Sequence, residues 1–114
     1  MNSSSDVIDA AARAEHDFPA LARFFGGYFH QDWQEEYGSS TAAVAAFVRD
    51  APAAGAAKTA AELDRVLALD LDDPALGRLL YDGFECNYVP QVDELSNRAW
   101  LQRVRALLQP PARA

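Results

Sequence analysis

The sequence predicts an all-α fold, arranged as a single compact domain of about five or six helices. Its 114 residues suffice for one domain with one hydrophobic core. Half of the residues are hydrophobic, and alanine alone makes up about a fifth of the chain, which favours helix. Apolar residues recur at spacings of three and four, and short turn signals separate these runs.

The first half of the chain contains a tail and two helical patterns. Residues 1–17 carry few large apolar side chains, so we expect an N-terminal tail with at most a weak helix. From Phe18 the apolar residues follow a helical spacing, with Pro19 in the first turn and Gly38 as a C-terminal stop. The serines that follow are good N-caps for a helix at 41–50.

The second half begins with a longer helix at 56–70. Alanine, leucine and valine form its buried stripe, and Glu62 and Arg65 lie one turn apart, so we expect them to pair weakly on its surface. Asp73 as N-cap and Pro74 at the first position then start a short helix.

The rest of the chain predicts an extended connection and a last helix. Gly83 ends the short helix, and 84–90 alternates between apolar and polar residues. Because no second strand pattern exists to pair with it, we expect an extended connection that lays Phe84, Cys86 and Tyr88 onto the core. Ser96 caps the last helix.

The domain boundaries follow from these elements. The last helix occupies 97–109, so the helical domain is expected at 18–109, and the C-terminal tail at 110–114 begins with two prolines.

The composition excludes several classes of function. The net charge is −7 and the isoelectric point about 4.6, which argues against direct nucleic-acid binding and favours a basic protein partner. No apolar run is long enough to span a membrane, and the N-terminus lacks the pattern of a signal peptide. The single cysteine, Cys86, cannot form an internal disulfide, so we expect a cytoplasmic protein.

The segment YFHQDWQEEYGSS, residues 28–40, concentrates aromatic, histidine and carboxylate side chains. The large rings of Tyr28, Phe29 and Trp33 are typical of a core, and His30 and Asp32 could satisfy buried polar groups there. We therefore interpret these five residues as a structural core motif.

The catalytic alternatives for this segment are weaker. Two histidines in the whole chain are too few for an ordinary zinc site, so no metal and no cofactor is expected. Asp32 and Glu36 could act as acid and base, yet they are also what a solvated helix face presents. Cys86 with His30 is nominally a nucleophile pair, although buried cysteine is usually inert. Gly26 and Gly27 lack the spacing of a phosphate loop; they weaken the helix or admit another backbone.

The chain resembles the immunity proteins of bacterial contact-dependent growth inhibition (CDI) systems, in particular a group with a GGYFHQDW-like signature. The resemblance is carried by FPALARFFGGYFHQDWQEEYGSSTAAVAAFV at 18–48, AAELDRVLAL at 60–69, CNYVP at 86–90 and SNRAWLQRVRALL at 96–108. It thus covers most of the chain after residue 17. The chain departs from the pattern at 93–95, where a glycine is expected, and in its longer N-terminal tail.

The resemblance implies a non-enzymatic protein that binds and neutralises the C-terminal toxin domain of its own delivery protein. Such toxins are often nucleases with basic active sites, which gives the acidic charge a reason. Since specificity varies between cognate pairs, we expect the contacts at exposed acidic positions outside the signature. The candidates are Glu62, Asp70, Asp72, Asp73, Asp82 and Glu85. An alternative patch comprises Asp32, Glu35, Glu36 and Tyr37.

Two other interpretations remain open at this stage. The chain could be a small acidic helical adaptor with another protein partner. It could also be an enzyme or metal protein that uses His30, Asp32 and Glu36.

Overall fold

The structure is a computed structural model that describes residues 12–108. Within this range it contains seven α-helices, two further helical turns and no strand, which confirms the predicted all-α class. The α-helices are α2 (Ala14–Asp17), α3 (Pro19–Tyr28), α4 (Trp33–Tyr37), α5 (Ser40–Asp50), α6 (Ala53–Leu67), α7 (Asp73–Arg78) and α8 (Asn97–Leu108). A π-helical turn, η1 (Leu79–Gly83), continues α7, and a 3₁₀ turn, η2 (Pro90–Asp93), precedes α8.

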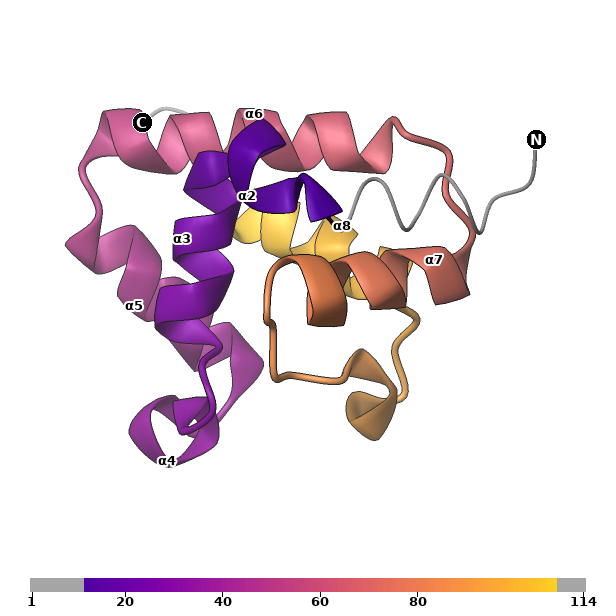
Figure 1. The fold of residues 1–114 in the computed structure, drawn as a ribbon. Helices are drawn as coiled ribbons and strands as arrows, with labels where there is room; N and C mark the ends of the chain where they lie inside the picture. Colours follow the sequence, from indigo (N-terminus) through magenta and orange to yellow (C-terminus); the bar gives the residue numbers. More distant parts are fainter. Residues whose placement is uncertain (1–11, 109–114) are drawn as a thin grey trace.

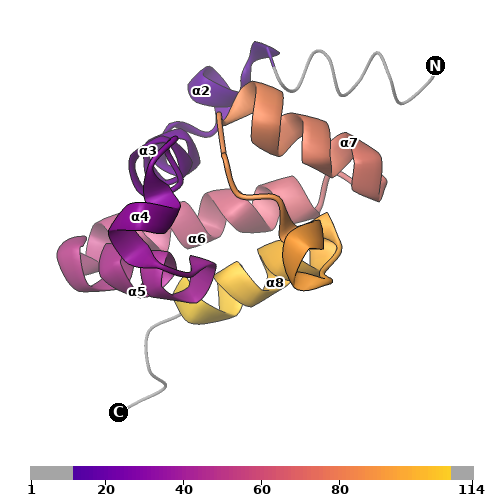
Figure 2. The same ribbon diagram turned by 90° about the horizontal axis from the view of Figure 1, so that it is seen from below.

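Helix α6 lies at the centre of the packing because it contacts both α3 and α8. Figure 1 shows α3 crossing α6 at a steep angle, with α4 at the end of α3 that points away from α6. The connection from η1 to η2 faces α4 (Figure 2), and side chains bridge the two, since the rings of Trp33 in α4 and Tyr88 in the connection lie 5.3 Å apart between centroids.

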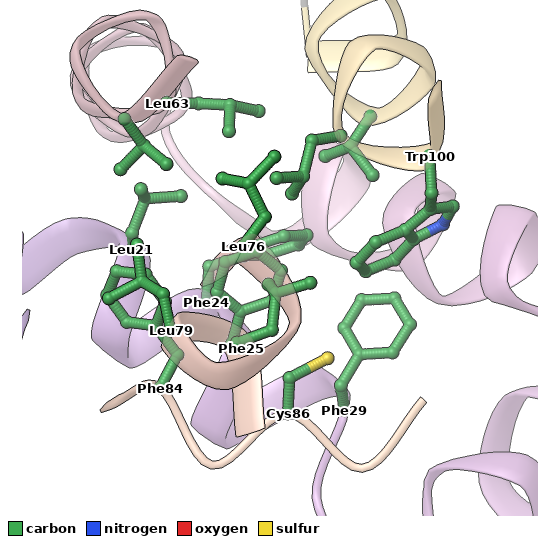
Figure 3. Close-up of a cluster of buried hydrophobic side chains, with 14 of the residues drawn as sticks. Leu21, Phe24, Phe25, Phe29, Leu63, Leu76, Leu79, Phe84, Cys86 and Trp100 are labelled. Carbon is green, nitrogen blue, oxygen red and sulfur yellow. The ribbon is translucent and has the colours of Figure 1, made fainter. Parts of the chain in front are cut away.

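The core is a cluster of buried side chains from nearly every element (Figure 3). Its largest fully buried members come from α3, α6, α7, α8 and the turn after α3; they include Leu21, Phe24, Phe25, Phe29, Leu63, Leu76 and Trp100. The Trp100 ring lies between 4.8 and 5.9 Å from the rings of Phe25, Phe29 and Tyr88, measured between centroids. Such tilted and edge-on aromatic pairs stabilise a core beyond the area that they bury.

The connection after η1 is extended, as predicted. Phe84, Cys86 and Tyr88 are all buried, at 3%, 1% and 3% exposed. The alternating pattern therefore reflects a single extended segment that packs on helices and not a strand in a sheet.

The helical pattern from Phe18 does not run unbroken to Gly38. It divides into α3 and α4, because the carbonyl oxygen of Phe29 accepts hydrogen bonds from the Asn87 backbone and side chain at 2.9 and 3.2 Å. In a continuous helix that oxygen would accept from the N–H of Trp33, which instead donates to the His30 carbonyl at 3.0 Å. A tertiary contact thus replaces a helical one. Gly38, with φ of 86°, ends α4 as predicted.

The boundaries of α6 and α7 differ from the prediction. Helix α6 begins and ends three residues earlier than the predicted 56–70. The prediction of Asp73 as N-cap is wrong by one residue, because Asp72 is the N-cap and its side chain accepts from the N–H of Ala75. The expected Glu62–Arg65 pair is also wrong: the Arg65 guanidinium lies 4.8 Å from the centroid of the Phe18 ring.

The packed part of the chain begins before Phe18. Helix α2 contacts α3, and Ala14 is fully buried. Residues 1–11 and 109–114 lie outside the described range, and with them the predicted C-terminal tail and most of the predicted N-terminal tail.

Candidate functional site

A groove of about 620 Å³ lies between α3 with the turn that follows it and η1 with the connection that follows it. It is lined by Gly26, His30 and Gln31 on the α3–α4 side, and by Tyr81, Asp82, Glu85 and Asn87 on the other. The two hydrogen bonds from Asn87 to the Phe29 carbonyl hold the two sides together.

The His30 ring is a fixed wall of this groove. Its Nδ1 accepts from the backbone N–H of Asp32 at 3.0 Å. Because a backbone N–H only donates, the second nitrogen, Nε2, carries the hydrogen and donates to Glu36 Oε1 at 2.9 Å. Both ring nitrogens are therefore engaged within the α3–α4 turn.

The groove is negatively charged. Asp82 and Glu85 are exposed, and no lysine or arginine lines the groove. Among the described residues, no ion pair engages either carboxylate. Glu85 has a left-handed backbone, with φ of 55°, between the buried side chains of Phe84 and Cys86. This conformation holds Glu85 outside the core while its two neighbours pack inside it.

Three other acidic candidates lie at or just before the start of α7, and none of them lines the groove. Asp70 is exposed, and Asp72 is exposed while it caps α7. Asp73 is half-buried because its carboxylate binds the start of α8, where the backbone N–H groups of Asn97 and Arg98 donate to it at 3.0 and 2.9 Å. Structural bonds thus already occupy Asp72 and Asp73.

The expectation that Glu62 is exposed is wrong. Glu62 is 5% exposed, and its Oε1 accepts from the backbone N–H of Leu21 at 3.0 Å. The physical reason is that α6 packs against α3 as well as α8, so its buried face is wider than the apolar stripe that the sequence displays.

Only part of the structural core motif predicted at 28–33 is buried. Phe29 and Trp33 are buried, whereas Asp32 is exposed, so the core position expected for Asp32 is wrong. Tyr28 is half-buried, and its phenol donates to Asp50 Oδ2 at 3.1 Å. Burial and this carboxylate raise the pKa of Tyr28.

The alternative patch adjoins the groove. Asp32, Glu35 and Glu36 are exposed around α4, and Tyr37 is half-buried. Burial and the neighbouring Glu36 raise the pKa of Tyr37. Since Glu36 binds His30, and His30 lines the groove with Asp82 and Glu85, the structure connects part of this patch to residues that the sequence placed in a separate set.

The catalytic alternatives receive little support from the geometry. Burial raises the pKa of the Cys86 thiol to about 12, so it stays protonated at neutral pH. Within residues 12–108, no three histidine, cysteine or carboxylate side chains gather as metal ligands would. None of the described helices combines the length and hydrophobicity that crossing a membrane requires.

Sequence reasoning missed three groove residues, Gln31, Asn87 and the exposed Tyr81. The Tyr81 side chain is 65% exposed, although aromatic residues elsewhere in the described chain are buried or half-buried. A signal existed: Tyr81 stands beside the apolar stripe of Leu76, Leu79 and Leu80 without belonging to it.

Two comparisons with known proteins bear on this chain. The family model described as CdiI immunity protein matches residues 17–108. One chain of the crystal structure of the CdiA-CT/CdiI complex from Y. kristensenii 33638 is 27% identical, with a TM-score of 0.77, and the similarity covers 82% of this chain and 99% of that one. Among curated proteins, none matches significantly.

Proposed function

The chain belongs to the CdiI immunity protein family, and from this membership we propose that it binds and neutralises the C-terminal toxin domain of its own CDI system. The observation that carries the proposal is the similarity to a chain of a CdiA-CT/CdiI complex over nearly the whole of that chain. The protein acts by binding, not by catalysis, in the cytoplasm of the cell that produces it.

The toxin domain in this proposal is a basic nuclease. A nuclease active site must attract phosphate, so its surface is positive, and a partner with a net charge of −7 is steered toward it. Covering the positive cleft would also exclude the nucleic-acid substrate. This electrostatic complementarity supports fast association, which immunity inside the producing cell requires.

The binding surface in this proposal centres on the acidic groove. Asp82 and Glu85 line it, and the alternative patch continues it through Glu36. Asp70 and Asp72, which belong to the acidic candidates chosen from the sequence, are exposed as well. They lie at the start of α7, whereas the groove lies beyond its end, so they contribute only long-range attraction. Glu62 plays no part because it is buried.

The experiment is calorimetry of this protein with the toxin domain encoded beside its gene, at two salt concentrations, with toxin activity measured in parallel. We expect one-to-one binding with a Kd of about 1 nM or below, weaker binding at higher salt, and loss of toxin activity at equimolar protein. An absence of binding would contradict the proposal and favour an adaptor with another partner. Binding to a toxin that leaves RNA and DNA intact would contradict the nuclease assignment alone.

A further inference from the structure

We propose that the groove receives a cationic side chain of the toxin domain, which stacks on the ring of Tyr81 and pairs with the carboxylates of Asp82 and Glu85. This inference rests on the proposed function and gives it a specific contact.

Tyr81 is the first part of the argument. It is the one aromatic side chain of the described residues that is exposed, at 65%, and it stands on the rim of the groove. Exposed tyrosines beside a depression are frequent anchors of protein interfaces, because the ring offers a large rigid surface at low entropic cost. Because most of the Tyr81 ring is exposed to solvent, packing of the core does not explain why a tyrosine occupies this position.

The charge of the groove selects the occupant. Asp82 and Glu85 add two carboxylates to the groove that Tyr81 also lines, and the lining contains no lysine or arginine to neutralise them. A guanidinium or ammonium group satisfies both features, because it is attracted to an aromatic face and forms charge-assisted hydrogen bonds with carboxylates. The same chain contains an internal example of the first contact, with Arg65 over Phe18.

Gly26 lines the α3 side of the groove, and because it has no side chain, the helix backbone is uncovered there. It lies inside α3, where glycine is less favourable than alanine. A Cβ atom at Gly26 or Gly27 would meet no other atom within 4 Å, so packing within the described part of the chain does not require either glycine. A bare helix surface instead lets the backbone of an approaching chain come close to α3 and deliver a side chain into the groove.

The test measures binding of the same toxin domain to variants of the full chain, with thermal unfolding as the control for folding. We expect Tyr81→Ala to weaken binding by about tenfold or more and Tyr81→Phe to change it by less than about threefold, because phenylalanine keeps the ring. The pair Asp82→Asn with Glu85→Gln should weaken binding by about tenfold or more and reduce its salt dependence. Gly26→Ala should weaken binding while raising the melting temperature.

A matched control is the pair Asp64→Asn with Glu94→Gln. Both residues are exposed, both lie outside the groove, and the pair removes the same two charges. We expect a change of less than about threefold. If the natural chain binds tightly and the groove variants bind as it does, or if the control pair weakens binding equally, this inference is wrong although the proposed function stands. If the natural chain does not bind, the proposed function itself fails.

Discussion

The carboxylate of Glu62 in α6 caps the N-terminus of α3 by accepting the backbone N–H of Leu21 at 3.0 Å. The N-cap residue of α3 is Phe18, whose side chain cannot accept this bond. A negative group at a helix N-terminus is stabilised both by the free N–H and by the helix dipole. A residue expected on the surface therefore connects two central helices.

Removal of this cap should destabilise the protein. We expect Glu62→Ala to lower the free energy of unfolding by about 2–3 kcal/mol, because it leaves a buried N–H without a partner. Glu62→Gln keeps an oxygen acceptor and should cost about 1 kcal/mol. Urea unfolding followed by tryptophan fluorescence measures both. Glu35→Ala, on an exposed position of α4, is the control and should change stability by less than about 0.5 kcal/mol; an equal loss there would contradict a specific role for Glu62.

Asp73 should matter for stability more than any other acidic residue at the start of α7. Its carboxylate accepts from the first two N–H groups of α8, those of Asn97 and Arg98. We expect Asp73→Asn to cost about 1–2 kcal/mol, since the amide can replace only part of these bonds. Asp70→Asn is the matched control, because Asp70 is exposed and asparagine tolerates its φ of 60°. Comparable losses of stability in the two variants would contradict a specific role for the hydrogen bonds between Asp73 and the start of α8.

Alanine should have opposite effects at two helical glycines. A Cβ at Gly77 would lie 2.8 Å from Asn97 Nδ2, and hydrogen bonds to Asp73 hold that amide in place. We expect Gly77→Ala to destabilise the fold by about 1–3 kcal/mol through this clash. Gly26→Ala enters open space and should stabilise the free protein by about 0.5–1 kcal/mol. Thermal unfolding of both variants tests the contrast; a stabilised Gly77→Ala would show that Asn97 can move aside.

The stability should fall at alkaline pH. Burial raises the pKa of Cys86 from 9.0 to about 12, and burial with the Asp93 hydrogen bond raises that of Tyr88 from 10.0 to about 12. The folded state thus holds these protons more tightly than the unfolded state, so their contribution is complete below pH 9 and is lost as the pH rises toward 12. Each group contributes a slope of up to about 1.4 kcal/mol per pH unit within its interval.

Tyr88→Phe isolates one of these groups. The variant keeps the ring in the core and removes the ionisable hydroxyl, so the decrease in stability between pH 10 and 12 should become less steep. Urea unfolding at a series of pH values measures the slope, and equal slopes in the variant and the natural chain would contradict the assignment to Tyr88.

The sequence predicted which acidic residues of the candidate site are exposed, but not that they lie together in one groove. Asp82 and Glu85 were correctly read as exposed from their positions near the end of a short helix. That they line one groove with His30 and Gln31 could not be predicted. The two sides of the groove are joined by hydrogen bonds between Asn87 and Phe29, which are 58 residues apart in the sequence. Tyr81 was missed because its one signal, a large ring beside the stripe of Leu76, Leu79 and Leu80 and outside it, does not say which distant residues the ring will face.

The sequence by itself determined the all-α class, the caps at Ser39 and Ser96, the stop at Gly38 and the extended connection that carries Phe84 to Tyr88. These features depend on spacing and on the chemistry of neighbouring residues, which are local. Only the tertiary structure decided that Glu62 is buried, that Asp73 binds a second helix and that the helical pattern breaks after Tyr28. Each of these is set by a hydrogen bond between distant segments, and an acceptor such as a carboxylate has no local feature that reveals which distant N–H it will meet.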